Sequence, residues 1–391
     1  MLGSPDIHLP EGNSTVAATS VTRTKTRRTT PILVASLATL SLFSIAACGG
    51  SETSENTQPA ATTATSDVST VAPVAKDPCE TASGSLTVYS GRSEKLVADL
   101  YTQFTSDTGI DVEVRYGDSG ELAGQILTEG NATPADVFFS QDAGALGAVS
   151  EAGLFVELED AVLNRVAAKY RSETNTWVGT SGRARVVVFN PTLVSTPPTS
   201  IDELVDPQWN GKIAFAPTNA SWQSFVTALR VVRGEDDARE WLEAFAANNP
   251  VAYEKNGAVR DAVNSGEVAL GLVNHYYLYE KIAAEGEENV VAQNQYLPGD
   301  IGGLVNVAGI GALENSDNPT GSQCLASYLV SDTAQKFFVE KSFEYPLVDG
   351  IAPFDGLPTL AELDPPSIDL SDLKSIAETQ ELLNDIGLLS L

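Results

Sequence analysis

Short apolar stretches alternate with amphipathic stretches along most of the chain beyond about residue 80. Strand-like patterns occur at residues 85–90, 110–116 and 135–139, and each is followed by a turn and then by helical periodicity. A comparable pattern returns at residues 213–216 and 268–273. Alternation of strands with helices predicts an α/β fold, with mixed sheets flanked by helices.

The last of these strands leads into a pair of tyrosines. Asn274 is a suitable helix N-cap, and a helix is expected over residues 275–285. Tyr276 and Tyr277 then lie in the first helical turn, beyond the carboxyl end of a strand, where open α/β folds bind ligands. The free N–H groups at a helix N-terminus favour anions, including phenolates.

The rest of the chain restricts which metal such a pair could bind. Histidine occurs only at positions 8 and 275, and the single methionine is Met1. A site for a soft metal built from several His or Cys ligands is therefore excluded, whereas an oxygen site for a hard cation is not. Tyr has a pKa near 10, so it binds a metal only when the metal displaces its proton, as ferric ion does. Two packed amphipathic rings are the alternative.

The N-terminus has the features of an export signal. Basic residues precede an apolar stretch at 31–47, which ends in Ile-Ala-Ala before Cys48. We expect residues 1–47 to be a lipoprotein signal peptide and Cys48 to be the lipidated residue; a membrane-spanning anchor is the alternative. Residues 48–78 are rich in Ser, Thr, Ala and Pro and are expected to form a disordered tether.

Charge and cysteine content narrow the function further. The net charge of −29 makes a nucleic-acid partner untenable. Cys79 and Cys324 are an even pair in an exported chain, which suggests a disulfide; two separate thiols are the alternative. No nucleophile–base pair is visible, so an enzyme is not expected.

Several sequence motifs resemble those of bacterial ferric-ion-binding proteins, the solute-binding subunits of iron ABC importers. The motifs are Val88-Tyr-Ser-Gly-Arg92, Arg115-Tyr-Gly-Asp-Ser-Gly-Glu-Leu-Ala-Gly124, Pro134-Ala-Asp-Val-Phe-Phe139, Ser181-Gly-Arg-Ala-Arg185, Asn274-His-Tyr-Tyr277 and Glu344-Tyr-Pro-Leu347. The resemblance implies a two-lobe periplasmic-binding-protein fold of type 2, with two crossing hinge strands. Lobe I would comprise residues 79–183 and 307–391, and lobe II residues 184–306.

The resemblance also implies a ligand set, with Tyr276 and Tyr277 as the central metal ligands. Where some relatives have a ligating His and Glu, this chain has Ser93 and Gln141. It thus resembles the subgroup that completes iron coordination with a carbonate or bicarbonate anion, and Arg92 is the expected partner of that anion.

Other expected contacts come from both lobes. Tyr116, at the end of a strand, is the candidate third phenolate. Further candidate anion or cleft contacts are Arg183, Asn219, Ser221, Asn256 and Asn274. Two alternatives remain open, since Arg92 could pair with an acid across the cleft and Arg183 could only brace the hinge. His275 is expected beside the ligands or at the surface.

The expected function is capture rather than catalysis. A monomer, lipid-anchored at the outer face of the cytoplasmic membrane, would bind Fe³⁺ and deliver it to an ABC permease and its ATPase subunit. The alternatives are a carrier of another small anion, such as a phosphonate or an organic acid, and a purely structural surface lipoprotein.

Overall fold

The computed structural model describes residues 77–389. The predicted signal peptide, the lipidation of Cys48 and nearly all of the predicted tether lie outside these residues. Among the described helices, none combines the length and the apolar content that crossing a membrane requires.

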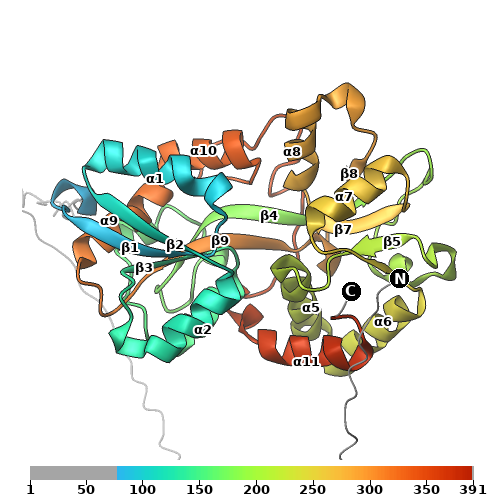
Figure 1. The fold of residues 1–391 in the computed structure, drawn as a ribbon, viewed down its shortest axis with the longest axis horizontal. Helices are drawn as coiled ribbons and strands as arrows, with labels where there is room; N and C mark the ends of the chain where they lie inside the picture. Colours follow the sequence, from blue (N-terminus) through green and yellow to red (C-terminus); the bar gives the residue numbers. More distant parts are fainter. Residues whose placement is uncertain (1–76, 390–391) are drawn as a thin grey trace, which may run out of the picture. The chain divides into compact units, whose positions relative to one another are not determined.

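A mixed sheet of nine strands organises the described part of the chain (Figure 1). Along the sheet the order is β2-β1-β3-β9-β4-β7-β5-β6, and β8 pairs with β4 beside this path. The strands are β1 (Ser85–Ser90), β2 (Asp111–Tyr116), β3 (Val137–Ser140), β4 (Val178–Phe189), β5 (Ile213–Phe215), β6 (Val251–Ala252), β7 (Leu270–Asn274), β8 (Gln293–Gln295) and β9 (Val305–Ala312).

Strand β4 belongs to both halves of the sheet. It pairs antiparallel with β9 as far as Ala184↔Val305, and with β7 from Arg185↔Asn274 onward. One half therefore contains β2, β1, β3 and β9, and the other contains β7, β5, β6 and β8. We call them lobe I and lobe II, and the hinge is the part of β4 and β9 that joins them.

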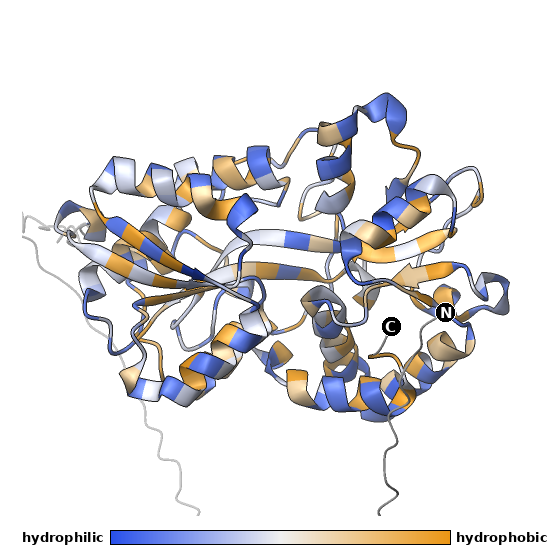
Figure 2. Ribbon diagram, in the orientation of Figure 1, coloured by the Kyte–Doolittle hydropathy of each residue, from blue (hydrophilic) through white to orange (hydrophobic). Residues whose placement is uncertain are grey.

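Helices flank the strands, as the alternating pattern predicted. They are α1 (Glu94–Thr108), α2 (Ser119–Glu129), α3 (Ala143–Glu151), α4 (Asp160–Leu163), α5 (Ala220–Arg233), α6 (Glu235–Ala247), α7 (Asn256–Ser265), α8 (Tyr276–Glu285), α9 (Pro319–Leu329), α10 (Asp332–Ser342) and α11 (Ile376–Ile386). Helix α1 buries Val97, Leu100, Tyr101 and Phe104, which share one face of a 3.6-residue repeat. Figure 2 shows hydrophobic and hydrophilic residues mixed along such helices.

The three loops at the carboxyl ends of β1, β2 and β3 meet at one edge of lobe I. These strands are parallel, and hydrogen bonds link their loops: Gly91 N donates to Phe139 O at 2.8 Å, and Gly117 N donates to Ser90 O at 3.1 Å. A Cβ at Gly91 would lie 2.0 Å from the hydroxyl oxygen of Ser119, so the close approach of two loops requires glycine there.

The C-terminal segment corrects the predicted lobe division. The 3-10 helix η8 (Leu370–Lys374) packs on α3 of lobe I, but α11 packs on α5 and α6 of lobe II. The buried Arg230 of α5 donates to Thr379 Oγ1 at 2.7 Å and to Ser375 O at 3.0 Å. A buried guanidinium needs acceptors, and α11 supplies them together with an apolar face. Residues 307–391 therefore do not all belong to lobe I.

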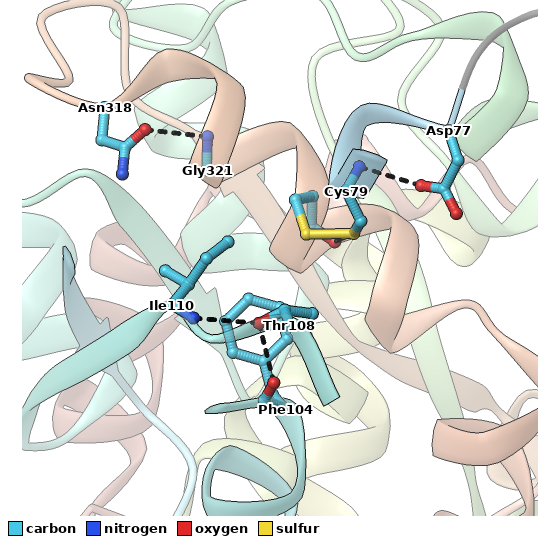
Figure 3. Close-up of a disulfide and its surroundings, with 8 residues drawn as sticks. Asp77, Cys79, Phe104, Thr108, Ile110, Asn318 and Gly321 are labelled. Atoms are coloured by element: carbon cyan, nitrogen blue, oxygen red, sulfur yellow. Dashed lines mark hydrogen bonds between the residues drawn. A yellow bond between two sulfur atoms is a disulfide. The ribbon is translucent and has the colours of Figure 1, made fainter. Parts of the chain in front are cut away.

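A disulfide joins the start of the described chain to lobe I. Cys79, in the 3-10 helix η1 (Pro78–Glu80), is bonded to Cys324 of α9, with 4.6 Å between the Cα atoms (Figure 3). Asp77 accepts a hydrogen bond from Cys79 N at 3.0 Å, which holds the short helix in place. The bond closes a loop in which the two cysteines are 245 residues apart.

Replacing both Cys79 and Cys324 by Ser should lower the free energy of unfolding by about 2–5 kcal/mol, because a cross-link over a long loop restricts the unfolded chain. Urea unfolding of the wild type, with and without reductant, and of the double variant measures the effect. Equal midpoints for oxidised and reduced wild type would contradict this expectation.

Candidate metal centre

Tyr276 and Tyr277 lie side by side at the start of α8. Their ring centroids are 4.4 Å apart and the ring planes are inclined by 28°. Tyr276 is 3% exposed, whereas Tyr277 is half-buried. Neighbouring residues on a helix point about 100° apart, so the stacked rings show that both side chains turn to the same side of the helix end. Both phenol side chains thus extend to one side of the helix end, as two ligands of a single cation would have to.

The strand before the tyrosines ends one residue later than predicted: it was expected over residues 268–273, and β7 covers Leu270–Asn274. Asn274 is the last residue of β7 and pairs with Arg185, and the strand contact continues as His275 N donates to Ala184 O at 2.9 Å. His275 takes the N-cap position without a side-chain cap. The prediction that Asn274 caps the helix was wrong, because Asn274 is still paired with Arg185 in the strand and the helix begins only at Tyr276.

His275 is fully buried beside the hinge. Its Nδ1 lies 3.2 Å from Ala184 N, and its Nε2 lies 2.8 Å from Phe343 O. Burial lowers the pKa of His275 to about 4, so the imidazole is neutral at physiological pH. Of the two places expected for His275, beside the ligands or at the surface, the structure shows the first.

The electrostatic surroundings of Tyr276 keep its phenol protonated in the absence of a cation. Burial raises the pKa of Tyr276 well above its ordinary value, and Tyr277 adds to the effect, whereas the nearby Arg183 opposes it. A phenolate therefore forms here only when a strong Lewis acid replaces the proton.

Arg92 forms a fully buried ion pair with Glu344 of the segment after α10. The Nη2–Oε2 distance is 2.8 Å, and Ser181 Oγ of β4 donates to the same carboxylate at 2.7 Å. The alternative expected an acid across the cleft, whereas Glu344 follows α10 and lies in the same lobe as Arg92. Within residues 77–389, however, Nε and Nη1 of Arg92 have no hydrogen-bond partner. The pair thus leaves two nitrogens of the guanidinium without an acceptor in the described residues.

Arg183 is the second buried cation of this region. It donates to Gln141 O, and its Nε has no partner among the described residues. Burial lowers the pKa of Arg183, and the neighbouring charge of Arg92 lowers it further, whereas Glu344 and Tyr276 act in the opposite direction. Arg183 is therefore close enough to Tyr276, Arg92 and Glu344 for their charges to act on it, and its hydrogen bond to Gln141 joins β4 to the loop after β3.

A polar cluster marks the N-terminus of α5 in lobe II. Asn219 caps the helix by accepting from Ser221 N at 3.0 Å and from Ser221 Oγ at 2.7 Å. Asn256 Nδ2 donates to Asn219 Oδ1 at 3.0 Å and to Ser221 Oγ at 3.1 Å. Three of the predicted anion contacts are thus brought together at a helix N-terminus, where anions are favoured.

Arg185 is the residue of this region that the sequence analysis missed. It is buried, donates to Ser221 O at 3.1 Å and lies over the rings of Trp222 and Phe225. Burial lowers the pKa of Arg185 to about 9, and no carboxylate of the described chain forms an ion pair with it. The available signal was its spacing: in a strand, Arg183 and Arg185 point to the same face.

The remaining predicted residues lie farther from the tyrosine pair. Tyr116 ends the edge strand β2, where burial and the charge of Glu94 raise its pKa. It has no hydrogen bond or ring contact with Tyr276 or Tyr277 in residues 77–389. Ser93 is exposed at the N-cap position of α1, without a cap bond.

Carboxylates, cysteines and histidines do not form the metal-binding group here. Across residues 77–389, no three or more His, Cys, Asp or Glu side chains are grouped so that they could hold an ion. Gln141, in the position of a ligating Glu in some relatives, contributes its backbone oxygen to Arg183 and its backbone N–H to Ser119 Oγ at 2.9 Å.

Comparison with known proteins decides the family. Residues 85–336 match the model of the bacterial extracellular solute-binding proteins. The chain belongs to this family.

Relatives within the family match nearly the whole of the described part. The Fe(3+)-binding periplasmic protein of Serratia marcescens is 34% identical over 79% of this chain and 92% of its own. Iron-bound HitA from Pseudomonas aeruginosa aligns with a TM-score of 0.74 and 33% identity, covering 78% of this chain and 99% of its own. A Trichodesmium protein in complex with iron and citrate has a TM-score of 0.68, 30% identity and coverages of 78% and 99%.

These similarities confirm two expectations. The resemblance to ferric-ion-binding proteins holds over the folded part, and the type 2 periplasmic-binding-protein fold of this solute-binding protein is shown by its structural relatives. The lobe arrangement, in which β4 and β9 connect two α/β halves, is the feature of that fold on which the candidate site depends.

Removing one member of the buried ion pair should be costly. Glu344→Gln leaves the Arg92 charge without its partner and should lower the free energy of unfolding by about 3–5 kcal/mol. The double variant Arg92→Met with Glu344→Gln should lose less free energy of unfolding than the sum of the losses in the two single variants. Urea unfolding of the four proteins gives the coupling energy.

The control is the exposed pair Arg165–Asp332, for which the corresponding changes should cost less than about 1 kcal/mol. Strict additivity at Arg92 and Glu344 would show that the buried pair carries no coupling and would contradict the prediction.

Proposed function

We propose that this solute-binding protein captures ferric ion together with a carbonate or bicarbonate anion. Tyr276 and Tyr277 supply two phenolates, and the anion occupies coordination positions that protein side chains leave open. The observation that carries the proposal is the stacked tyrosine pair at the N-terminus of α8, beside the hinge. The matched relatives include proteins whose names state ferric-ion binding.

The charges around the pair favour this chemistry. Arg92, Arg183 and Arg185 are buried, and Glu344 is the one carboxylate that forms an ion pair with any of them in the described chain. An excess of positive charge stabilises both a phenolate and a bound anion. Nε and Nη1 of Arg92 have no acceptor among the described residues, so an anion bound there would accept from N–H groups that Glu344 leaves unpartnered.

Lobe II would contribute the other contacts to the anion. Asn219, Ser221 and Asn256 present polar atoms at the N-terminus of α5, and Asn274 ends the strand that carries the tyrosines. In lobe I, Ser93 and Gln141 follow β1 and β3, and Tyr116 remains the candidate third phenolate, to be brought nearer by closure of the lobes. Rotation about β4 and β9 would then exclude water from the ion.

Delivery completes the proposed function. A monomer held at the outer face of the cytoplasmic membrane by a lipid on Cys48 would pass the ion to an ABC permease with its ATPase subunit. No step of capture or release requires a covalent change, so the protein acts as a carrier and not as an enzyme.

A second candidate function is transport of another small anion, such as an organic acid or a phosphonate. The buried arginines favour it, and one structural relative is described with both iron and citrate. The two functions differ in which ligand binds by itself. A carrier of an organic acid or a phosphonate would bind that anion in the absence of iron.

Adding Fe³⁺ to the purified protein should produce a visible phenolate-to-iron charge-transfer band. Tyr276→Phe and Tyr277→Phe should each weaken binding by at least about tenfold, and the double variant should lose the band. Tyr253→Phe, in a tyrosine of lobe II that bonds to Glu267, is the control and should leave the band unchanged. Retained iron binding in the double variant would refute the site.

The same titration should depend on pH. Because burial holds the pKa of Tyr276 above its ordinary value, its phenol is protonated at neutral pH and binding must release the proton. Affinity at a fixed concentration of free Fe³⁺ should therefore rise with pH, by about tenfold per unit for each proton released. Tyr276→Phe should make the slope shallower.

Removal of bicarbonate tests the anion. Iron affinity in bicarbonate-free buffer should fall at least about tenfold and recover when bicarbonate is added, because the arginines then regain their acceptor. Arg92→Met should remove this dependence, whereas the surface change Arg233→Met should not. Recovery with citrate but not with bicarbonate would assign a different anion.

A further inference from the structure

Hydrogen bonds of both the backbone and the ring hold His275 in place. Its backbone N–H donates to Ala184 O at 2.9 Å, and its backbone oxygen accepts from Asn294 Nδ2 at 2.9 Å. The ring accepts from Ala184 N at Nδ1, so the proton of the neutral imidazole is on Nε2, which donates to Phe343 O. All hydrogen-bonding groups of the residue are used.

These bonds connect three parts of the molecule. Ala184 is the last residue of β4 that pairs with β9, so it lies where the strand changes lobes. Phe343 follows α10 of lobe I and has a left-handed backbone, with a φ of 56°. His275 itself directly precedes Tyr276. The residue next to a proposed metal ligand is thus bonded to the hinge and to lobe I, although α8 belongs to lobe II.

The segment after α10 has a second connection to the same region. Tyr345 exchanges backbone hydrogen bonds of 2.8 Å with Gly182 of β4, and its ring lies 4.7 Å from the ring of His275. The His275 ring in turn meets the Tyr276 ring edge-on at 5.9 Å. Glu344, which lies between Phe343 and Tyr345 in the sequence, forms the ion pair with Arg92. The consecutive residues 343–345 therefore contact the hinge strand β4, His275 and the proposed anion-binding residue Arg92.

We propose that His275 is the positioning residue of the metal centre, fixing Tyr276 to the hinge and to lobe I. The inference rests on the proposed function. The bonds of His275 hold Tyr276 in one position, so the first phenolate is already oriented when the ion arrives. Pre-organised ligands bind more tightly because less conformational freedom is lost on binding.

A purely structural role for His275 would have a different consequence. A histidine that only satisfies buried polar groups would, when changed, lower stability without altering the tyrosine next to it. The two roles are therefore separated by measurements on Tyr276 itself and not by measurements of stability.

Three substitutions at position 275 separate the contributions of the two hydrogen bonds made by the His275 ring. Asn retains an acceptor near Nδ1, Gln retains a donor near Nε2, and Ala retains neither. His275→Ala should increase the rate at which a competing chelator removes Fe³⁺ by about tenfold and shift the phenolate charge-transfer band. His275→Asn and His275→Gln should show smaller effects, and they keep the test available if the Ala variant does not fold.

Thr227→Val is the control, because Thr227 is fully buried and its hydroxyl bonds to Thr379 on the far side of lobe II. It should lower the unfolding midpoint while leaving the band and the chelator rate at wild-type values. If the His275 variants behave like this control, the positioning role is refuted.

A measurement without iron separates this inference from the proposed function. In protein labelled with ¹³C at the tyrosine ring, the Tyr276 signal is assigned by its absence in Tyr276→Phe. His275→Ala should shift and broaden that signal, whereas Thr227→Val should leave it unchanged. A wild-type protein without any ferric band would refute the proposed function alone, and an unchanged Tyr276 signal in His275→Ala would refute the positioning role alone.

Discussion

The change of partner within strand β4 is the constraint on which the candidate site depends. Up to Ala184 the strand pairs with β9 in lobe I, and from Arg185 it pairs with β7 in lobe II. Alternation along the strand turns Arg183 and Arg185 to one face at this junction. The end of β7 pairs with β4 at the same junction. Helix α8 and its tyrosine pair therefore begin where the two lobes meet.

Under the proposed function, electrostatics would explain why this junction binds a trivalent cation and an anion together. Buried arginines without enough carboxylates are unfavourable until an anion joins them, and a buried phenol stays protonated until a strong Lewis acid replaces its proton. The anion compensates the positive charge of the buried arginines, and the cation compensates the negative charge that a phenol acquires when it loses its proton. A site of this kind gains from binding both species and gains less from either alone, which is the thermodynamic basis of a synergistic anion.

Local sequence signals were sufficient for many of the elements. The helical periodicity expected after the first strand is α1, whose apolar repeat and terminal Gly109 both agree with a helix of that length. The parallel β1, β2 and β3 bring three loops together, as expected from strand–helix alternation. The tyrosine pair at a strand's end and the pairing of Cys79 with Cys324 also followed from residue types and their positions.

Other features depend on contacts between residues distant in sequence, and only the tertiary structure decided them. Glu344 is 252 residues from Arg92, so no local pattern could identify it as the partner. Pairing with β4 made Asn274 a strand residue and buried His275, and Arg230 drew α11 onto lobe II. Periodicity and residue chemistry act over a few neighbours, whereas burial and charge pairing are set by whichever chain segment packs alongside.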